Sequence, residues 1–320
     1  MQKYNWFYNV SGNEENLKME VIPSFNERKQ LPACLFKVYS LNSNSIDSLL
    51  NSYIYASHPS EFNDIYDCHR NLIIYDDIDI LKAQLSNFLG ADHEFIIKIN
   101  KEKSIELASH ELFYQLLYSY VGLFSMTENP ENIMLWTHYC NNKGFAIEFN
   151  LDKLKKNFIS YGPFQINYQK EINQISIKEG IASAALFQSN IKYINWSYEN
   201  EWRLLIQPKK NHSFKIPNFP FCQPNAIDRK VPYKIDAIKC ILLGNLFFEN
   251  SEMKVINDRE LEINIYKDTE KKICVLNFIY DNNINAGIAL KNNTFSNIEL
   301  RFFKLEKLTL NKFKLIALEI

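Results

Sequence analysis

The chain has 320 residues, enough for one large domain, and its 46% hydrophobic and 23% charged content is ordinary for a globular protein. A formal net charge of −1 provides no overall attraction to nucleic acid or to a membrane surface. Only 8 glycines are present, and no G-x-G-x-x-G or G-x-x-x-x-G-K pattern occurs, which argues against Rossmann and P-loop nucleotide binding.

The cysteines and the apolar runs bear on location. The six cysteines are widely spaced and form no C-x-x-C pair, and the first residues lack the apolar core of a signal peptide. No apolar run reaches the roughly 20 residues that span a bilayer. We therefore expect a cytoplasmic protein with reduced thiols and no membrane association. The scattered histidines and cysteines form no recognisable metal-binding pattern, so we predict no metal site.

Helices and strands alternate along the first part of the chain. Residues 1–33 are predicted to be an N-terminal extension with some strand. The pattern then predicts, in order, a strand over 34–40, a short helix capped by Ser45, a strand over 53–57, a polar loop over 58–64, and helices over about 77–90 and 102–121.

The second part of the chain continues the alternation. The pattern predicts a strand over 121–125, a helix from Asn129-Pro130-Glu131 to Gly144, strands over 145–149 and 161–168, an Ala-rich helix over 178–194, a strand ending at Ile206, a Pro-rich loop over 208–225 and a strand over 238–243. Residues 246–320 read as a β-rich C-terminal extension. We predict an α+β fold with mixed, mostly antiparallel sheets and flanking helices, and a core domain over 34–245.

The stretch Trp196–Ile206 places two carboxylates and an arginine at the entry of an apolar strand. If the strand begins near Tyr198, then Glu199, Glu201 and Arg203 point the same way, because side chains alternate between faces. Two carboxylates on one face repel each other. Either Arg203 neutralises Glu201 in a structural salt bridge, or one carboxylate holds a sugar hydroxyl or orients a nucleophile. The residues alone leave both interpretations open.

Two further polar clusters have a structural and a functional interpretation. Trp136 and Tyr139 are neighbours on one helix face with His138 offset from them, so they form either an aromatic core stripe or part of a ligand site near a strand edge. Asn63 and Asp64 follow the second strand. They either close an Asx turn or reach a ligand from the strand end.

Four segments, taken in order, resemble the bacterial domain-of-unknown-function family 2971. They are the Phe62-Asn-Asp64 loop, Phe124-Ser125, Trp136-Thr-His-Tyr139 with Lys143-Gly-Phe145, and Trp196–Arg203, and Ile241–Gly244 is a weaker fifth. Together they span about residues 34–245. The sequence departs from the family pattern at Ile65, where proline is usual, and at Asn142, where histidine is frequent. The family label implies no established activity.

The order of polar groups is also similar to that of mono-ADP-ribosyltransferases, whose core this resemblance would imply. It implies Lys37 as the basic residue for the diphosphate of NAD, Ser57 as the serine that supports the catalytic carboxylate, Glu201 as that carboxylate, and Glu199 as the group that orients the acceptor. His138 joins them as a candidate catalytic residue. The candidate residues for binding NAD, the expected substrate, are Lys37, Tyr39, Ser57, Asn63, Asp64, Trp136 and Tyr139.

The resulting hypothesis is an NAD-consuming transferase, a toxin or phage-defence effector, acting on a protein or nucleic-acid acceptor. The first alternative is a non-enzymatic binding or sensor module for a nucleotide, a nucleic acid or a phage protein. The second is a nuclease that uses Asp64, Glu148 and Glu199 or Glu201, although no D…E-x-K spacing supports it.

Overall fold

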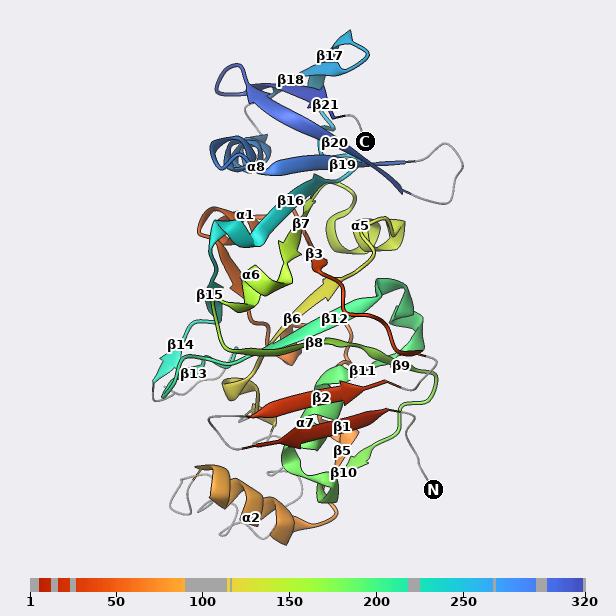
Figure 1. The fold of residues 1–320 in the computed structure, drawn as a ribbon, viewed down its shortest axis with the longest axis vertical. Helices are drawn as coiled ribbons and strands as arrows, with labels where there is room; N and C mark the ends of the chain where they lie inside the picture. Colours follow the sequence, from red (N-terminus) through yellow and green to blue (C-terminus); the bar gives the residue numbers. More distant parts are fainter. Residues whose placement is uncertain are drawn as a thin grey trace.

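The computed structural model describes residues 6–12, 17–23, 27–89, 114–115, 117–217, 225–266, 269–291 and 298–318. The molecule is elongated (Figure 1). The C-terminal strands lie at one end of its long axis. The hairpin β1–β2 (Phe7–Ser11 and Lys18–Ile22) and helix α2 (Ile78–Leu89) lie toward the other end.

An eleven-stranded sheet runs through the molecule. In spatial order its strands are β17 (Ser251–Asn257), β18 (Glu260–Ile265), β21 (Lys312–Ala317), β20 (Ile298–Lys307), β19 (Asn285–Lys291), β16 (Ile238–Leu243), β7 (Phe145–Asn150), β3 (Cys34–Tyr39), β6 (Gly122–Thr127), β12 (Glu201–Ile206) and β8 (Ser160–Gln165). Neighbouring strands in this sheet are antiparallel except β16 and β19. The predicted α+β class with a mixed, mostly antiparallel sheet is confirmed.

The central strands are buried on both faces, and their residues alternate between two cores. In β7, Phe145, Ile147 and Phe149 face a core that includes helices α1 (Ser43–Leu50), α6 (Leu151–Lys155) and α8 (Glu270–Asp281). Ala146 faces the other core, together with Trp136 of helix α5 (Ile133–Cys140). This division follows from the period-two alternation of a strand, and it places α5 and α1 on opposite faces (Figure 1).

Short elements complete the fold. The two-stranded pairs are β4 (Tyr53–Tyr55) with β15 (Lys230–Pro232), β5 (Ile73–Ile74) with β10 (Ile175–Ser176), β9 (Asn167–Gln169) with β11 (Ile191–Tyr193), and β13 (Ser213–Phe214) with β14 (Ala226–Ile227). Further helices whose bounds lie within the described residues are α7 (Ile181–Asn190) and the 3₁₀ turns η2 (Pro59–Glu61), η3 (Arg70–Leu72), η4 (Ile177–Glu179), η5 (Ile194–Glu199) and η6 (Ile235–Ala237).

Two helix starts differ from the sequence prediction. Helix α1 is capped by Asn42, whose side chain accepts a hydrogen bond from the Ser45 amide at 2.9 Å, and Ser45 is itself inside the helix. Helix α5 begins after Asn132, which caps the Met134 amide at 2.9 Å. In both places an asparagine carbonyl satisfies an amide that has no partner inside the helix.

Other predictions are corrected farther along the chain. The expected strand over 161–168 is interrupted near Ile166 and forms β8 and β9. The expected β-rich extension also contains the twelve-residue helix α8, and its strands continue the main sheet through β19 beside β16. The helix expected over 102–121 lies mostly outside the described residues. The division into 1–33, 34–245 and 246–320 stays a prediction.

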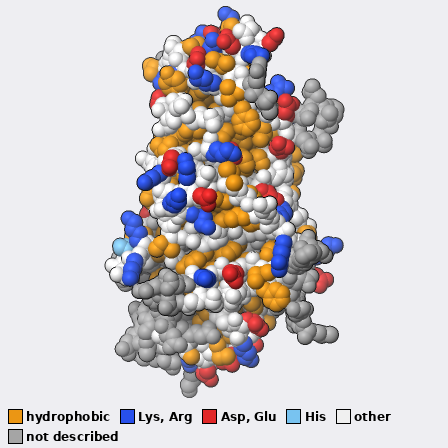
Figure 2. Space-filling view, viewed as in Figure 1, with side chains coloured by type: hydrophobic (Ala, Val, Ile, Leu, Met, Phe, Trp, Pro, Cys, Tyr) orange, Lys and Arg blue, Asp and Glu red, His pale blue; other side chains and the backbone are white. Residues whose placement is uncertain are grey.

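The surface carries both signs of charge. Basic and acidic side chains are interspersed on the face shown in Figure 2, in keeping with the formal net charge of −1. The five cysteines that the structure describes are free thiols. Among the described helices, none combines the length and apolar character needed to cross a membrane.

Candidate functional site

A cavity of about 420 Å³ lies where strands β3 and β6 separate. These strands share a single residue pair, Phe36 with Thr127. The cavity is lined on one side by Lys37 of β3 and on the other by Ser125 of β6. The full lining is Phe36, Lys37, Val38, Ser57, Glu61, Phe62, Asn63, Asp67, Ser125, Met126, Thr127, Leu135, His138, Tyr139, Lys192, Glu199 and Glu201.

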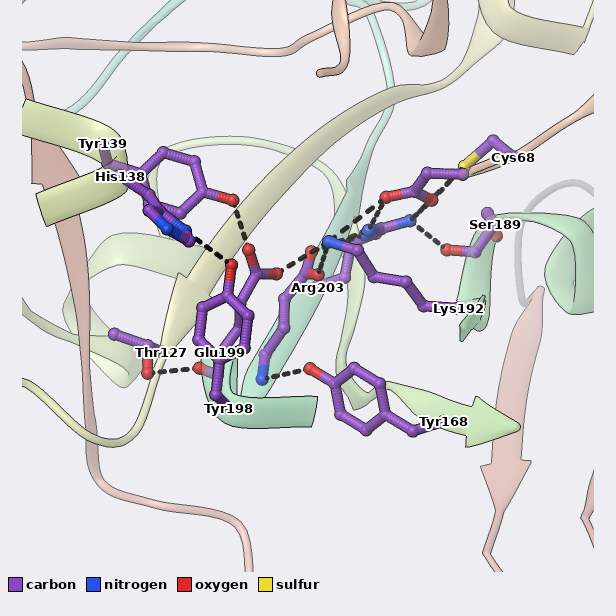
Figure 3. Close-up of polar contacts among 12 residues, drawn as sticks. Cys68, Thr127, His138, Tyr139, Tyr168, Ser189, Lys192, Tyr198, Glu199 and Arg203 are labelled. Atoms are coloured by element: carbon purple, nitrogen blue, oxygen red, sulfur yellow. Dashed lines mark hydrogen bonds and ion pairs between the residues drawn. The ribbon is translucent and has the colours of Figure 1, made fainter. Parts of the chain in front are cut away.

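Lys192 of β11 joins three carboxylates at this cavity. Its Nζ lies 2.7 Å from Glu199 Oε2, 3.1 Å from Glu201 Oε2 and 3.5 Å from Asp67 Oδ2, and all four side chains are at most 5% exposed. Figure 3 shows the ammonium group between the carboxylates. Carboxylates buried this closely repel one another unless a cation lies between them, so Lys192 makes the cluster possible.

Arg203 binds two of these carboxylates, those of Asp67 and Glu201, and lies outside the cavity lining. Its guanidinium donates two hydrogen bonds to Asp67, at 3.0 and 2.9 Å, and two to Glu201 Oε1, at 2.9 and 2.7 Å. It also donates to the Ser189 carbonyl at 2.7 Å (Figure 3). The salt bridge between Glu201 and Arg203, one of the two interpretations that the sequence left open, is therefore present, and Glu201 lines the cavity as well.

The two glutamates have pKa values displaced in opposite directions. Burial disfavours the charge of Glu201, but Arg203 and Lys192 outweigh it and lower its pKa to about 2. Burial raises the pKa of Glu199 above its ordinary value. Lys192 opposes that rise, and the charge of Glu201 reinforces it. One carboxylate thus stays ionised while its neighbour holds a proton more readily, which is the pattern of an acid–base pair.

Lys37 differs from Lys192 because its ammonium has no hydrogen bond or ion pair to the described residues. Its Nζ lies over the Phe124 ring, 5.6 Å from the ring centre. Burial lowers the pKa of Lys37, and the charges of Glu201 and Glu199 only partly offset that effect. An amine of this kind is available to an anionic ligand, whose charge would favour its protonated form.

An aromatic group borders the carboxylates. The Tyr139 hydroxyl donates a hydrogen bond to Glu199 Oε1, and Thr127 donates to the Glu199 carbonyl at 2.7 Å. His138 is exposed at the cavity, with its Nδ1 2.9 Å from the Tyr198 hydroxyl (Figure 3). His138 is thus a surface residue of the cavity and is not part of an aromatic core.

Glu199 reaches the cavity by a different route from the one expected. It ends the 3₁₀ turn η5, and strand β12 begins only at Glu201. Asn200 between them adopts a left-handed conformation, with φ of 43°. The predicted strand alternation therefore applies to Glu201 and Arg203. Glu199 lies in a turn, and the conformation of that turn brings its carboxylate to Lys192, which also binds Glu201.

The structure brings seven of the predicted residues to the cavity: Lys37, Ser57, Asn63, His138, Tyr139, Glu199 and Glu201. Three do not line it. Tyr39 stacks on Phe145, with ring centres 5.4 Å apart. Asp64 accepts a hydrogen bond from the Tyr66 amide at 2.9 Å, which is the Asx-turn interpretation. Trp136 is fully buried, and its indole donates to the Pro130 carbonyl at 2.7 Å.

Three residues of the site were not assigned to it from the sequence: Asp67, Lys192 and Ser125, of which Ser125 was named only as part of the Phe124-Ser125 segment. Ser125 lies opposite Arg203 in the sheet, and a hydrogen bond from its side chain helps to lower the pKa of Glu201. The sequence context of Lys192 contains one indication of its role. Lys192 follows Ile191 at the end of an apolar helix, where a charged side chain needs a buried partner. The sequence around Asp67 contains no such indication, because its partner Arg203 is 136 residues away.

The carboxylates considered for a nuclease do not form one group. Glu148 lies outside the cavity lining and pairs with Lys239 at 2.8 Å. Asp64 is likewise outside the lining. Over the described residues, no group of three or more histidine, cysteine, aspartate or glutamate side chains is arranged to hold a metal ion.

Comparison with known proteins bears on the middle of the chain. No curated protein and no solved structure matches it. The likeness to mono-ADP-ribosyltransferases stays a prediction. Residues 135–204, which contain the motifs Trp136–Tyr139 and Trp196–Arg203, match the family described as "Protein of unknown function (DUF2971)", and over this range the resemblance seen in the sequence is confirmed.

Proposed function

We propose that the cavity is the active site of an NAD-consuming transferase. The observation that carries this proposal is the pair Glu199 and Glu201, two carboxylates of one cavity whose pKa values are displaced in opposite directions. Cleavage of an N-glycosidic bond needs a fixed negative charge beside the ribosyl cation that forms and a base for the incoming nucleophile. The two glutamates supply one each.

The bond between C1′ of the ribose and the nicotinamide nitrogen breaks, and neutral nicotinamide leaves with the electron pair. Glu201, ionised at neutral pH because its pKa is about 2, stabilises the positive charge on the ribosyl group. The acceptor, which is water or a group on a macromolecule, bonds to C1′ and loses its proton to Glu199.

Other residues of the lining suit the remaining parts of the substrate. Lys37 is the cation of the cavity without an ion-pair partner among the described residues, and it provides a charge for the diphosphate without a glycine-rich loop. Phe36, Phe62 and Tyr139 offer rings against which nicotinamide can pack. Ser57 and Asn63 line the same space and can hydrogen-bond the ribose.

Release of nicotinamide from NAD tests the proposal. The purified full-length chain should release nicotinamide, and Glu201→Gln should lower the rate by about 10²–10³-fold, the usual effect of removing a group that stabilises the transition state. Glu148→Gln is the matched control, because Glu148 is also buried and ion-paired but lies outside the cavity lining. Full turnover by folded Glu201→Gln contradicts the carboxylate assignment, and no release by the wild type contradicts the proposed reaction.

A nucleotide-binding module is the second candidate. The observation that favours it is that both oxygens of Glu201 already accept hydrogen bonds, one from Arg203 and one from Lys192. Such a module would bind NAD in a calorimetric titration without releasing nicotinamide, and Lys37→Met would weaken that binding. Two other hypotheses have their own tests. Incubation with labelled nucleic acid and magnesium tests the nuclease alternative, which predicts cleavage. Expression in bacterial cells tests the toxin hypothesis, since cells that express the wild type and cells that express Glu201→Gln should then differ in growth.

A further inference from the structure

Strand β17 is an open edge of the eleven-stranded sheet, far from the cavity. It is the first strand in the sheet order, and among the described residues it pairs with β18 alone. Six of its seven residues are exposed, including Met253 at 56% and Val255 at 73% (Figure 1, upper end). An exposed edge with apolar side chains is a template for pairing with another strand, because its outward amides and carbonyls have no strand partner.

The regular part of β17 is limited by a bulge. Residues Ser251–Val255 pair one to one with β18, and the register shifts between Val255 and Asn257. A bulge bends a strand and ends regular pairing. Five residues therefore present a straight edge, and Met253 is their midpoint. A second copy of the strand, placed antiparallel about a two-fold axis at Met253, would pair along all five.

The charges of β17 are self-complementary in that same register. Glu252 of one copy lies directly opposite Lys254 of the other, and the two-fold axis repeats this pair, while Met253 faces Met253. An axis at Lys254 would instead place the two lysines opposite each other, and like charges in that position are destabilising. The register that uses the whole straight edge is thus also the one that pairs opposite charges.

We propose that two copies of this chain associate through β17, antiparallel and centred on Met253, so that their sheets become continuous. Lys254 discourages the approach of unrelated apolar strands, as charged residues on edges do, but it matches Glu252 of a second copy. The interface is isologous and closes after two copies. It is independent of the proposed enzymatic function, because β17 contributes no residue to the cavity lining.

A charge exchange tests the register. The mass of the full chain is measured by sedimentation over a range of concentrations for the wild type, Glu252→Lys, Lys254→Glu and the double variant. Each single change should raise the dimer dissociation constant by about tenfold, because it creates two like-charge pairs, and the double variant should restore it. Lys254 also faces Glu262 within its own chain, so thermal unfolding of each variant is followed to separate folding from association.

Cross-linking provides a second test. Met253→Cys should form a disulfide-linked dimer on mild oxidation, because directly opposed residues of antiparallel strands have Cα atoms about 4.5–5.5 Å apart, within disulfide range. Val255→Cys is the matched control, because the two Val255 positions would lie about 13 Å apart at 3.3 Å per residue. A wild type that stays monomeric, a double variant no better than the single ones, or equal cross-linking at 253 and 255 would overturn the proposal.

Discussion

Glu199 and Glu201 accept hydrogen bonds from one ammonium group, that of Lys192, although Glu199 ends a 3₁₀ turn and Glu201 begins a strand. Two carboxylates that share one cation cannot titrate independently, because the charge of either raises the pKa of the other. Both also line the same cavity. The stability of this part of the fold and the chemistry of the site therefore depend on the same three side chains.

Removal of Lys192 should destabilise the fold strongly. In Lys192→Met the carboxylates of Asp67, Glu199 and Glu201 lose their common cation while they remain buried. We expect a loss of about 3–5 kcal/mol in the free energy of unfolding, the usual effect of breaking a buried pair. Urea denaturation at neutral pH measures it. The control is Lys230→Met, whose surface pair with Asp47 spans 2.9 Å and should matter little. Equal losses in the two variants would contradict the importance of the cluster.

The stability that Glu201 contributes should disappear in acid. Its pKa in the folded chain is about 2, below the ordinary value of 4.5, so the folded state favours the ionised form. That contribution is complete above pH 4.5 and is lost as the pH falls through 2. The difference in unfolding free energy between the wild type and Glu201→Gln should therefore shrink over this interval. Urea titrations at successive pH values measure it, and a constant difference would contradict the ion pairs with Arg203 and Lys192.

Loss of the Tyr139 hydroxyl should move the titration of Glu199 upward. Burial already raises the pKa of Glu199, and the hydrogen bond from Tyr139 opposes that rise. Tyr139→Phe should raise the pKa further and lower stability at neutral pH by about 1.5–3 kcal/mol, as for other hydrogen bonds to charged groups. Carbon NMR of the Glu199 carboxyl follows the pKa. Tyr53→Phe is the control, because its hydroxyl donates to the surface residue Asp47 at 2.6 Å; it should leave the Glu199 titration unchanged. A titration unmoved in Tyr139→Phe would exclude this contact.

Gly144 should tolerate no side chain. A Cβ at this position would lie 2.0 Å from the Tyr39 carbonyl oxygen and 2.6 Å from Cys140 Cβ. The ends of strand β3 and helix α5 would therefore have to move away from residue 144. We expect Gly144→Ala to cost at least about 1–3 kcal/mol, the range for overpacking. Thermal unfolding measures it. Lys143→Ala, a change at an exposed neighbour, is the control, and similar melting temperatures for both would contradict this close packing.

Much of the local structure could be predicted from residue order. The strands β3, β7 and β16 lie within a residue or two of their predicted bounds, because their apolar runs are continuous or alternate with period two. Helix starts were less predictable. Asn42 and Ser45 both belong to residue types that favour the N-cap position. Which of them caps the helix depends on the position at which the chain leaves the preceding strand.

The candidate site could be predicted only in part. His138 and Glu201 could be predicted to lie at the cavity because each belongs to a recognisable motif near a helix or strand end, whereas Lys37, inside strand β3, was predicted only from the resemblance to mono-ADP-ribosyltransferases. Trp136 has an equally distinctive position, but its indole ring is turned into the core, and side-chain direction within a short helix depends on which face the sheet covers.

The sequence by itself determined the approximate bounds of strands such as β3, β7 and β16, and that Glu201 and Arg203 share one face of β12. These are local properties, set by side-chain alternation and by apolar runs. Only the tertiary structure decided that Asp67 and Lys192 join them, since ion pairs between residues as distant as Asp67 and Arg203, 136 positions apart, depend on the path of the whole chain. It also decided that β3 and β6 part after a single pair, which opens the cavity beside Lys37.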